Sequence, residues 1–197
     1  KQAWIRVGQQ LGYPIDESVI CQIRGATPQA SAEVFQNAFG NEFDYVAAKK
    51  MRNDIVEQMI QQDGIPIMKG LRQLLTELHE KKLPCAVASS SPRNTIERYL
   101  DIADIRAYFC TVVGAEDILR SKPFPDPFLT AAKRMDISAE HCLVLEDSAN
   151  GLYAAYSAGM KVICIPDISK PTEAIQKCDA HVLNDLSCVS EWIRNEE

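Results

Sequence analysis

Apolar residues in the first third of the chain recur at helical spacing. Trp4, Val7 and Leu11 lie three or four residues apart, which places them on one face of a helix. Residues that favour helix starts are Asp16 and the pair Thr27 and Pro28. A long helix is predicted over Phe43 to Gln62, and Gly64 marks its end. We therefore predict that residues 1–66 form an all-helical domain.

Short apolar segments alternate with helical patterns from residue 67 onward. A helix is predicted from leucines that repeat at its spacing, namely Leu71, Leu74, Leu75 and Leu78. The predicted strands are the segments CAVAS, CTVVG, CLVLED, KVICIP and AHVL. Short apolar strands separated by helices are typical of βαβ units and a mostly parallel sheet. The predicted fold class is therefore α/β, with a Rossmann-like sheet core flanked by helices over residues 67–197.

Composition narrows the kinds of partner that the protein can have. Of the 197 residues, 46% are hydrophobic and 24% are charged, as in soluble globular proteins. The formal net charge is −6 and no tract of Lys and Arg occurs, which argues against nucleic acid and membranes as partners. No apolar run approaches membrane-spanning length, and the first ten residues lack a signal-peptide hydrophobic region. We expect a cytoplasmic protein, a monomer or weak homodimer, that acts on a small molecule.

The cysteines and histidines suggest no chemistry of their own. No CxxC spacing occurs and most cysteines lie in apolar segments, so we expect core thiols rather than a zinc site or disulfides. The seven are Cys21, Cys85, Cys110, Cys142, Cys164, Cys178 and Cys188. The three histidines lack ligand spacing and are His79, His141 and His181.

Polar side chains suited to ligand binding follow three of the predicted strands. In open α/β sheets, ligands gather at the carboxyl ends of the strands. Ser89, Ser90 and Ser91 follow the first strand, and their hydroxyl and backbone N–H groups can hold a phosphate oxygen at a helix start. The same Ser-Ser-Ser-Pro sequence is also a common helix-capping turn, and this alternative stays open.

Lys122 lies in the loop segment RSKPFPDPFL, directly before a proline. A lone loop lysine is usually solvated, but one that is stiffened by the following proline is well suited to neutralise a buried phosphate. Asp126 begins the next predicted helix. Its position favours an N-cap role over a catalytic one.

Two adjacent carboxylates, Glu146 and Asp147, follow another strand. Like charges side by side are costly unless a cation or hydrogen-bond donors lie between them. In one alternative, Asp147 or Ser148 caps the following helix and Glu146 is solvated. A pair at a buried strand end is better suited to a hard cation, and Mg²⁺ commonly uses one or two carboxylates plus substrate phosphate. We predict that the pair holds Mg²⁺.

The segments AVASSS, SKPFPDPFL and LVLEDSANGLYAAYSAGM resemble the second, third and fourth motifs of the haloacid dehalogenase superfamily, in its β-phosphoglucomutase-like branch. The resemblance spans nearly the whole chain and implies a helical cap over a Rossmann-like core. It implies that Ser89 binds the transferring phosphoryl group and that Lys122 balances charge there. It also implies that Glu146 and Asp147 lie at a Mg²⁺ site. Ser121 stands where many relatives have Gly.

The first motif of that family, an Asp-x-Asp at the end of the first strand, does not occur in these 197 residues. In the family this motif supplies the nucleophile and then the general acid/base. We expect that a strand, the nucleophile loop and a linker, roughly twenty residues, are missing from the chain as written. Because the nucleophile is missing, this chain alone is expected to hydrolyse no phosphate ester. Because the missing strand lies centrally in the family sheet, the chain is also expected to be poorly stable.

The resemblance implies in-line attack by an Asp on a phosphate monoester, which gives an aspartyl-phosphate that water or a second hydroxyl removes. Arg24 and Arg52 are candidate cap contacts to a distal anionic group of the substrate, although each could equally be a surface arginine. We expect a phosphatase for a small phosphorylated metabolite such as a sugar phosphate. A phosphomutase and a non-catalytic binding module are the alternatives. The segment GATPQAS lacks the basic residue that mutase-like caps carry after this Gly, which favours the phosphatase.

Overall fold

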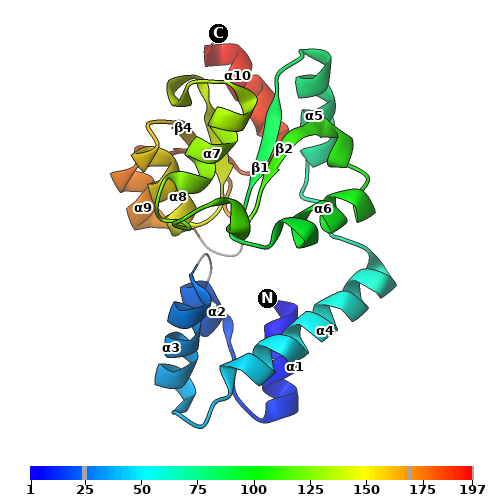
Figure 1. The fold of residues 1–197 in the computed structure, drawn as a ribbon, viewed down its shortest axis with the longest axis vertical. Coiled ribbons are helices and arrows are strands. Elements are labelled where there is room, and N and C mark those ends of the chain that lie inside the picture. The colour runs from blue at the N-terminus through cyan, green and yellow to red at the C-terminus, as the bar shows by residue number, and fades with distance from the viewer. Residues whose placement is uncertain (24–25, 168–169, 197) are drawn as a thin grey trace. The chain divides into compact units, whose positions relative to one another are not determined.

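The computed structural model describes residues 1–23, 26–167 and 170–196. The chain divides into two compact units, Lys1–Ile65 and Pro66–Glu197 (Figure 1).

The described residues of the first unit are helical. The helices are α1 (Gln2–Leu11), α2 (Glu17–Ile23), α3 (Pro28–Phe39) and α4 (Tyr45–Asp63). Their ends follow the predicted signals. The carboxylate of Asp16 accepts the N–H of Val19 at 3.1 Å, and Thr27 caps α3 by accepting the N–H of Ala30 at 3.2 Å. The fourth helix begins two residues later than predicted, because Asp44 caps it and leaves Phe43 outside.

Aromatic rings fill the core of the helical unit. Phe35 is fully buried, and its ring centroid lies 4.8 Å from those of both Trp4 and Phe43. Val7 is buried with them, one turn along α1 from Trp4. Leu11 shares their spacing but is 40% exposed, because α1 ends there, before the left-handed Gly12.

Strands and helices alternate in the second unit. The strands are β1 (Cys85–Ala88), β2 (Phe109–Val113), β3 (Leu143–Glu146), β4 (Lys161–Cys164) and β5 (His181–Val182). The α-helices are α5 (Leu71–Glu80), α6 (Arg93–Ile102), α7 (Asp126–Met135), α8 (Ala149–Ser157), α9 (Thr172–Lys177) and α10 (Val189–Glu196). Short 3₁₀ turns are η1 (Arg106–Tyr108), η2 (Ala115–Asp117), η3 (Ala139–His141) and η4 (Leu186–Cys188).

Every strand pair in the described residues is parallel, which confirms the predicted α/β fold class. In the described residues the strands form two separate sheets, β1–β2 and β3–β4–β5. No ladder joins β1 to β3 in this part of the chain. Helix α7 packs on β1 and β2 and also on α8, so side-chain packing connects the two sheets.

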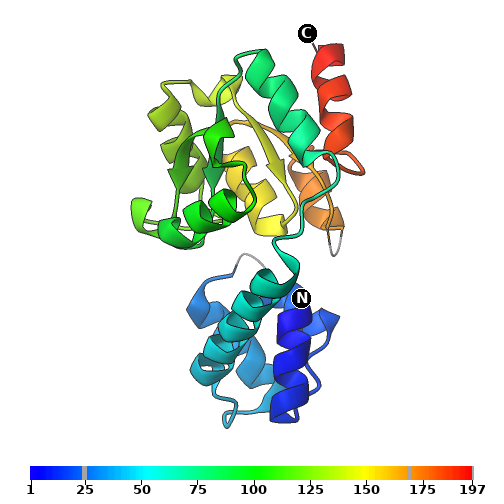
Figure 2. The ribbon, with the colours of Figure 1, turned by 90° about the vertical axis from the view of Figure 1, so that its right-hand side faces the viewer.

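Helices cover both faces of the larger sheet. Alternate residues of β4 pack into two different hydrophobic clusters, one on each face of the sheet, because side chains alternate between the faces of a strand. Val162 and Cys164 pack with α7, α8 and α9, whereas Ile163 packs with α5 and α10, which lie side by side in Figure 2. Ala88, the last residue of β1, also packs against the cluster that contains α8.

The cysteines only partly match the expected core thiols. All seven are free, and Cys164 and Cys178 are buried, but Cys110 is exposed and the other four are half-buried. A short strand places alternate side chains outside the core even in an apolar segment. Among residues 1–23, 26–167 and 170–196, no helix combines the length and the apolar character needed to span a membrane.

Candidate functional site

The turn after β3 holds the carboxylate of Glu146 close to its own backbone. Its Oε2 accepts the N–H groups of Asp147 at 3.0 Å and of Ser148 at 3.2 Å, and also the Ser148 hydroxyl at 3.1 Å. Ser148 in turn caps α8, since its Oγ accepts the N–H of Gly151 at 3.1 Å. Of the alternative in which Asp147 or Ser148 caps the helix and Glu146 is solvated, the cap is confirmed for Ser148 and the solvated Glu146 is wrong.

Lys122 binds the other carboxylate oxygen of Glu146. Its Nζ forms an ion pair with Oε1, and only 11% of the lysine side chain and 9% of the glutamate side chain are exposed. The ammonium group also lies 4.6 Å from the ring centroid of Phe128 on α7, a cation–π contact. The alternative of a solvated loop lysine is therefore wrong, because α7 and the β3 turn enclose the side chain.

The space for Glu146 depends on a glycine in the first turn of α8. A Cβ atom on Gly151 would lie 2.0 Å from the carboxylate carbon of Glu146. Any side chain at position 151 would therefore displace the carboxylate. Gly151 and Phe128 both support the ion pair, and sequence reasoning assigned neither to the site. The signal was present for Gly151, because glycine is unfavourable inside a helix unless close packing requires it.

Electrostatics keep Glu146 charged. Burial disfavours the carboxylate, but attraction to the Lys122 ammonium, its hydrogen bond and the backbone donors of Ser148 and Asp147 outweigh this effect. The pKa of Glu146 therefore lies below its ordinary value. At neutral pH the pair is ionic.

The carboxylates at the end of β3 fit a hard cation. Glu146 and Asp147 offer oxygen ligands, and Mg²⁺ is commonly bound by one or two carboxylates together with phosphate and water oxygens. Within the described residues no group of three or more His, Cys, Asp and Glu side chains is arranged to hold a metal. The pair therefore suits an ion whose remaining ligands come from a substrate, from water or from other residues.

The serine loop after β1 is held against the end of β2. The N–H of Ser89 donates to the carbonyl of Val113 at 3.0 Å, and the Ser89 hydroxyl oxygen accepts the N–H of Ser91 at 3.2 Å. Helix α6 starts beyond the loop with Pro92 at its N-cap, and no serine side chain caps it. Helix capping by the serines is therefore wrong. Because Ala88 packs against the cluster of α8, the loop leaves β1 beside that helix.

The other predicted residues lie elsewhere. Asp126 is the first residue of α7 rather than its N-cap, because Pro125 takes that position. Its carboxylate instead accepts two hydrogen bonds from Arg120, at 3.2 and 3.0 Å. Arg52 lies on α4 and donates to the side chain of Asn53 at 3.0 Å. Arg24 lies outside the described residues. The contacts thus unite Lys122 with Glu146, the neighbour of Asp147 in sequence, and leave the arginine roles as predictions.

Residues 5–165 match the family model described as haloacid dehalogenase-like hydrolase. The chain belongs to this family. The chain is 32% identical over 166 residues to the β-phosphoglucomutase of Bacillus subtilis, an alignment that covers 80% of this chain and 72% of the relative. It is 37% identical over 127 residues to the bifunctional riboflavin kinase/FMN phosphatase of Arabidopsis thaliana, which covers 64% of this chain and only 33% of the longer plant protein.

Solved structures share the fold of the hydrolase. The crystal structure of β-phosphoglucomutase from Clostridium difficile superposes with a TM-score of 0.78 at 22% identity, over 98% of this chain and 87% of that chain. Together with the Bacillus subtilis relative, this places the chain in the β-phosphoglucomutase-like branch that the three motifs predicted.

Proposed function

We propose that this hydrolase is a Mg²⁺-dependent phosphatase that acts on a small phosphorylated metabolite, such as a sugar phosphate, through an aspartyl-phosphate intermediate. The observation that carries the proposal is the buried ion pair of Lys122 and Glu146 beside Asp147, at the carboxyl end of a parallel strand. Family membership and the similarity to the bifunctional riboflavin kinase/FMN phosphatase of Arabidopsis thaliana support phosphate esters as the substrate class.

Each proposed side chain has a separate task. Lys122, held by Glu146 and Phe128, presents a fixed positive charge to the phosphoryl group. Asp147, with Glu146, would hold Mg²⁺, which when bound supplies further positive charge to the phosphate oxygens. Ser89 donates a hydrogen bond to the phosphoryl group, with Ser90 and Ser91 in the same loop. Low exposure of the ion pair strengthens these interactions because little water screens them.

The nucleophile must come from a further carboxylate. Glu146 is bound to Lys122 and is assigned to the metal together with Asp147, and no Asp-x-Asp spacing occurs in the 197 residues. We propose that an Asp carboxylate attacks phosphorus in line, so that the P–O bond to the leaving group breaks as the bond to the carboxylate forms. Water then hydrolyses the aspartyl-phosphate and releases inorganic phosphate. The substrate-selecting role of the helical unit, with Arg24 and Arg52, stays a prediction.

A phosphomutase is the second candidate, and the 32% identity to the Bacillus subtilis β-phosphoglucomutase favours it. The two activities differ in the acceptor, because a mutase returns the phosphoryl group to a sugar hydroxyl rather than to water. Inorganic phosphate release from sugar phosphates therefore distinguishes them from each other.

The test uses the natural full-length protein with a panel of sugar phosphates and an aryl phosphate. We expect phosphate release that needs Mg²⁺, stops with a chelator and returns when Mg²⁺ is added back. Lys122→Met is the inactive control. Isomer formation without phosphate release would favour the mutase. No reaction with any ester in the presence of Mg²⁺ would contradict both enzymatic proposals.

A further inference from the structure

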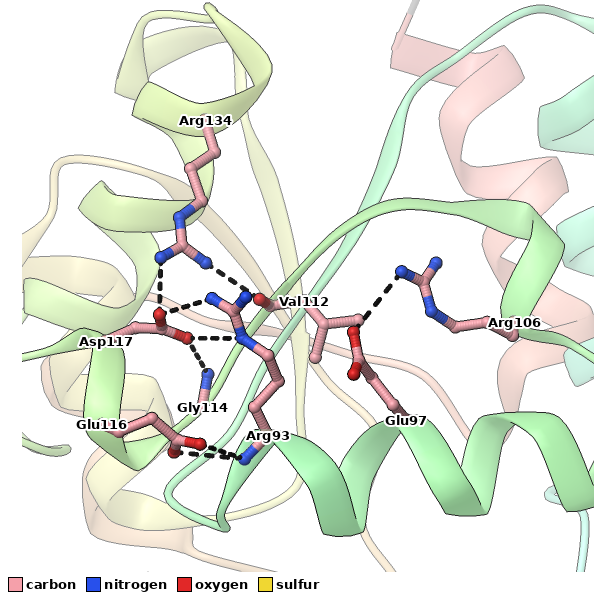
Figure 3. Close-up of polar contacts among 8 residues, drawn as sticks. All are labelled: Arg93, Glu97, Arg106, Val112, Gly114, Glu116, Asp117 and Arg134. Carbon is pink, nitrogen blue, oxygen red and sulfur yellow. Dashed lines mark hydrogen bonds and ion pairs between the residues drawn. The ribbon is translucent and has the colours of Figure 1, made fainter.

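One carboxylate outside the proposed site collects donors from three elements. Asp117, at the end of η2, accepts hydrogen bonds from Nε of Arg93 at 3.1 Å and from a terminal nitrogen of the same guanidinium group (Figure 3). Arg134, in the last turn of α7, donates to it at 2.6 Å, and the N–H of Gly114 donates at 2.8 Å. Only 12% of the Asp117 side chain is exposed. These groups form one compact network.

The network joins the two segments that carry Ser89 and Lys122. Arg93 is the first residue of α6 and follows the serine loop directly. Asp117 begins the segment that leads to Lys122, and Arg134 lies on the helix in which that segment ends. Arg134 also donates to the carbonyl of Val112 at 2.9 Å, which fixes α7 to β2. A displacement of Asp117 would therefore also displace the serine loop and the segment that carries Lys122.

The contact between α6 and the chain after β2 leaves little freedom. A Cβ atom on Gly114 would lie 2.6 Å from the backbone nitrogen of Arg93. The same backbone N–H is bound by both carboxylate oxygens of Glu116, at 3.0 and 3.1 Å. Backbone and side chain of Arg93 are thus held by two different carboxylates (Figure 3).

The charge of Asp117 is stable over a wide pH range. Hydrogen bonds from Arg134, then Arg93, then the N–H of Gly114 hold the pKa of its carboxyl well below its usual range. Neutralising this carboxylate would leave two guanidinium groups facing each other. The arrangement is therefore sensitive to mutation rather than to pH.

We infer that Asp117 is a positioning residue for phosphoryl transfer, which holds the serine loop and the Lys122 segment at a fixed separation. The inference rests on the proposed function. Asp117 acts through Arg93 and Arg134, and it has no contact with substrate. Because Ser89 and Lys122 are assigned to charge that develops in the transition state, a change in their separation should lower kcat more than it raises KM.

The test compares Asp117→Asn, Asp117→Glu and Arg134→Lys in the natural full-length protein, with an aryl phosphate and Mg²⁺. The matched control is Glu97→Gln, on the same helix as Arg93, which removes the 3.6 Å pair with Arg106 of η1 but none of the hydrogen bonds to Asp117 (Figure 3). All kinetics are measured where circular dichroism shows each variant folded.

We expect Asp117→Asn to lower kcat by about 10- to 100-fold with KM within about twofold, since small misplacements of catalytic groups have costs of this size. Asp117→Glu should recover part of the loss because it restores the charge, and Glu97→Gln should match the wild type. If Asp117→Asn does not fold, Arg134→Lys is compared with the wild type instead. This variant keeps the positive charge but cannot bind both the Val112 carbonyl and the Asp117 carboxylate as the guanidinium group does.

An active wild type with unchanged kcat in Asp117→Asn, or with a change in KM alone, would overturn the positioning role and leave the proposed function standing. A fall in kcat that matches a fall in the folded fraction would also overturn it. A wild type that releases no phosphate from any ester would overturn both proposals.

Discussion

The ammonium group of Lys122 and a carboxylate oxygen of Glu146 form an ion pair across 24 residues of sequence, with about nine-tenths of each side chain covered. Replacing Lys122 by Met leaves the carboxylate buried without its partner. Breaking one side of a buried pair costs about 3–5 kcal/mol of unfolding free energy. We expect Lys122→Met to lose stability on this scale in urea unfolding and to lose phosphate release by at least about 100-fold.

The double variant Lys122→Met with Glu146→Gln separates the two effects. Removing both charges avoids the unpaired carboxylate, so stability should largely return while hydrolysis does not. Lys133→Met, at an exposed position of α7, is the control for loss of a lysine. Hydrolysis at the wild-type rate in Lys122→Met would return this residue to a purely structural role.

Asp147→Asn tests the proposed metal ligand. An amide is a weaker ligand for Mg²⁺ than a carboxylate, so we expect at least about tenfold weaker Mg²⁺ binding by titration calorimetry of the natural full-length protein. The fold should stay intact. The control is Asp136→Asn at the left-handed end of α7, a conformation that Asn tolerates. Unchanged Mg²⁺ affinity in Asp147→Asn would contradict the assignment.

Gly151→Ala should act through Glu146 alone. The added methyl group would overlap the carboxylate, whose carbon lies 2.0 Å from the new Cβ. Displacing Glu146 removes the partner of Lys122, so both stability and hydrolysis should fall, by about 2 kcal/mol or more for stability.

Gly159→Ala is the matched control for that glycine variant. Gly159 has a φ of +70° and open space around its Cβ position. It should lose about 1 kcal/mol through backbone strain and keep its activity. Equal effects of both variants on hydrolysis would show that overlap between a side chain at position 151 and the Glu146 carboxylate does not cause the loss of activity.

Acid should remove the stabilisation that Asp185 provides. This carboxylate accepts hydrogen bonds from Lys69 at 2.7 Å and from the N–H of Ser187 at 2.9 Å, which lower its pKa to about 2. The pKa of Asp in an unfolded chain is about 3.9. The charged form therefore contributes stability above about pH 4, and this contribution disappears as the pH falls towards about 2.

The measurement is the urea midpoint of wild type and Asp185→Asn between pH 7 and pH 2. We expect a constant difference above about pH 5 that narrows below about pH 4. Asp179→Asn, at an exposed position, is the control. A difference that stays constant down to pH 2 would mean that charge on Asp185 is not the source of its effect.

Local signals predicted most of the fold. Helix ends at Thr27 and Gly64 and the cap at Ser148 depend on neighbours within four residues, which sequence patterns report directly. The strands were predicted from apolar runs, but their division into two sheets was not, because pairing depends on contacts distant in sequence.

The site was predicted only in part, for the same reason. Lys122 and Glu146 were each predicted as site residues from the sequence around them. Neither local sequence predicts the ion pair between the two. Asp117, Arg93 and Arg134 look like ordinary surface charges in sequence, since each is polar within a polar neighbourhood. Their convergence on one carboxylate becomes visible only when α6, α7 and the turn after β2 are assembled.

Amide hydrogen exchange should reveal the separation of β1–β2 from β3–β4–β5 as two protection classes. Backbone bonds couple β3, β4 and β5 around the fully buried Ile163 and Cys164, so these amides should exchange only when that sheet opens as a whole. Strands β1 and β2 share a ladder with each other alone and meet the rest through α7. Their amides should exchange in a distinct, faster group, and the serine loop between β1 and α6 would then sample open states that the Glu146 turn does not.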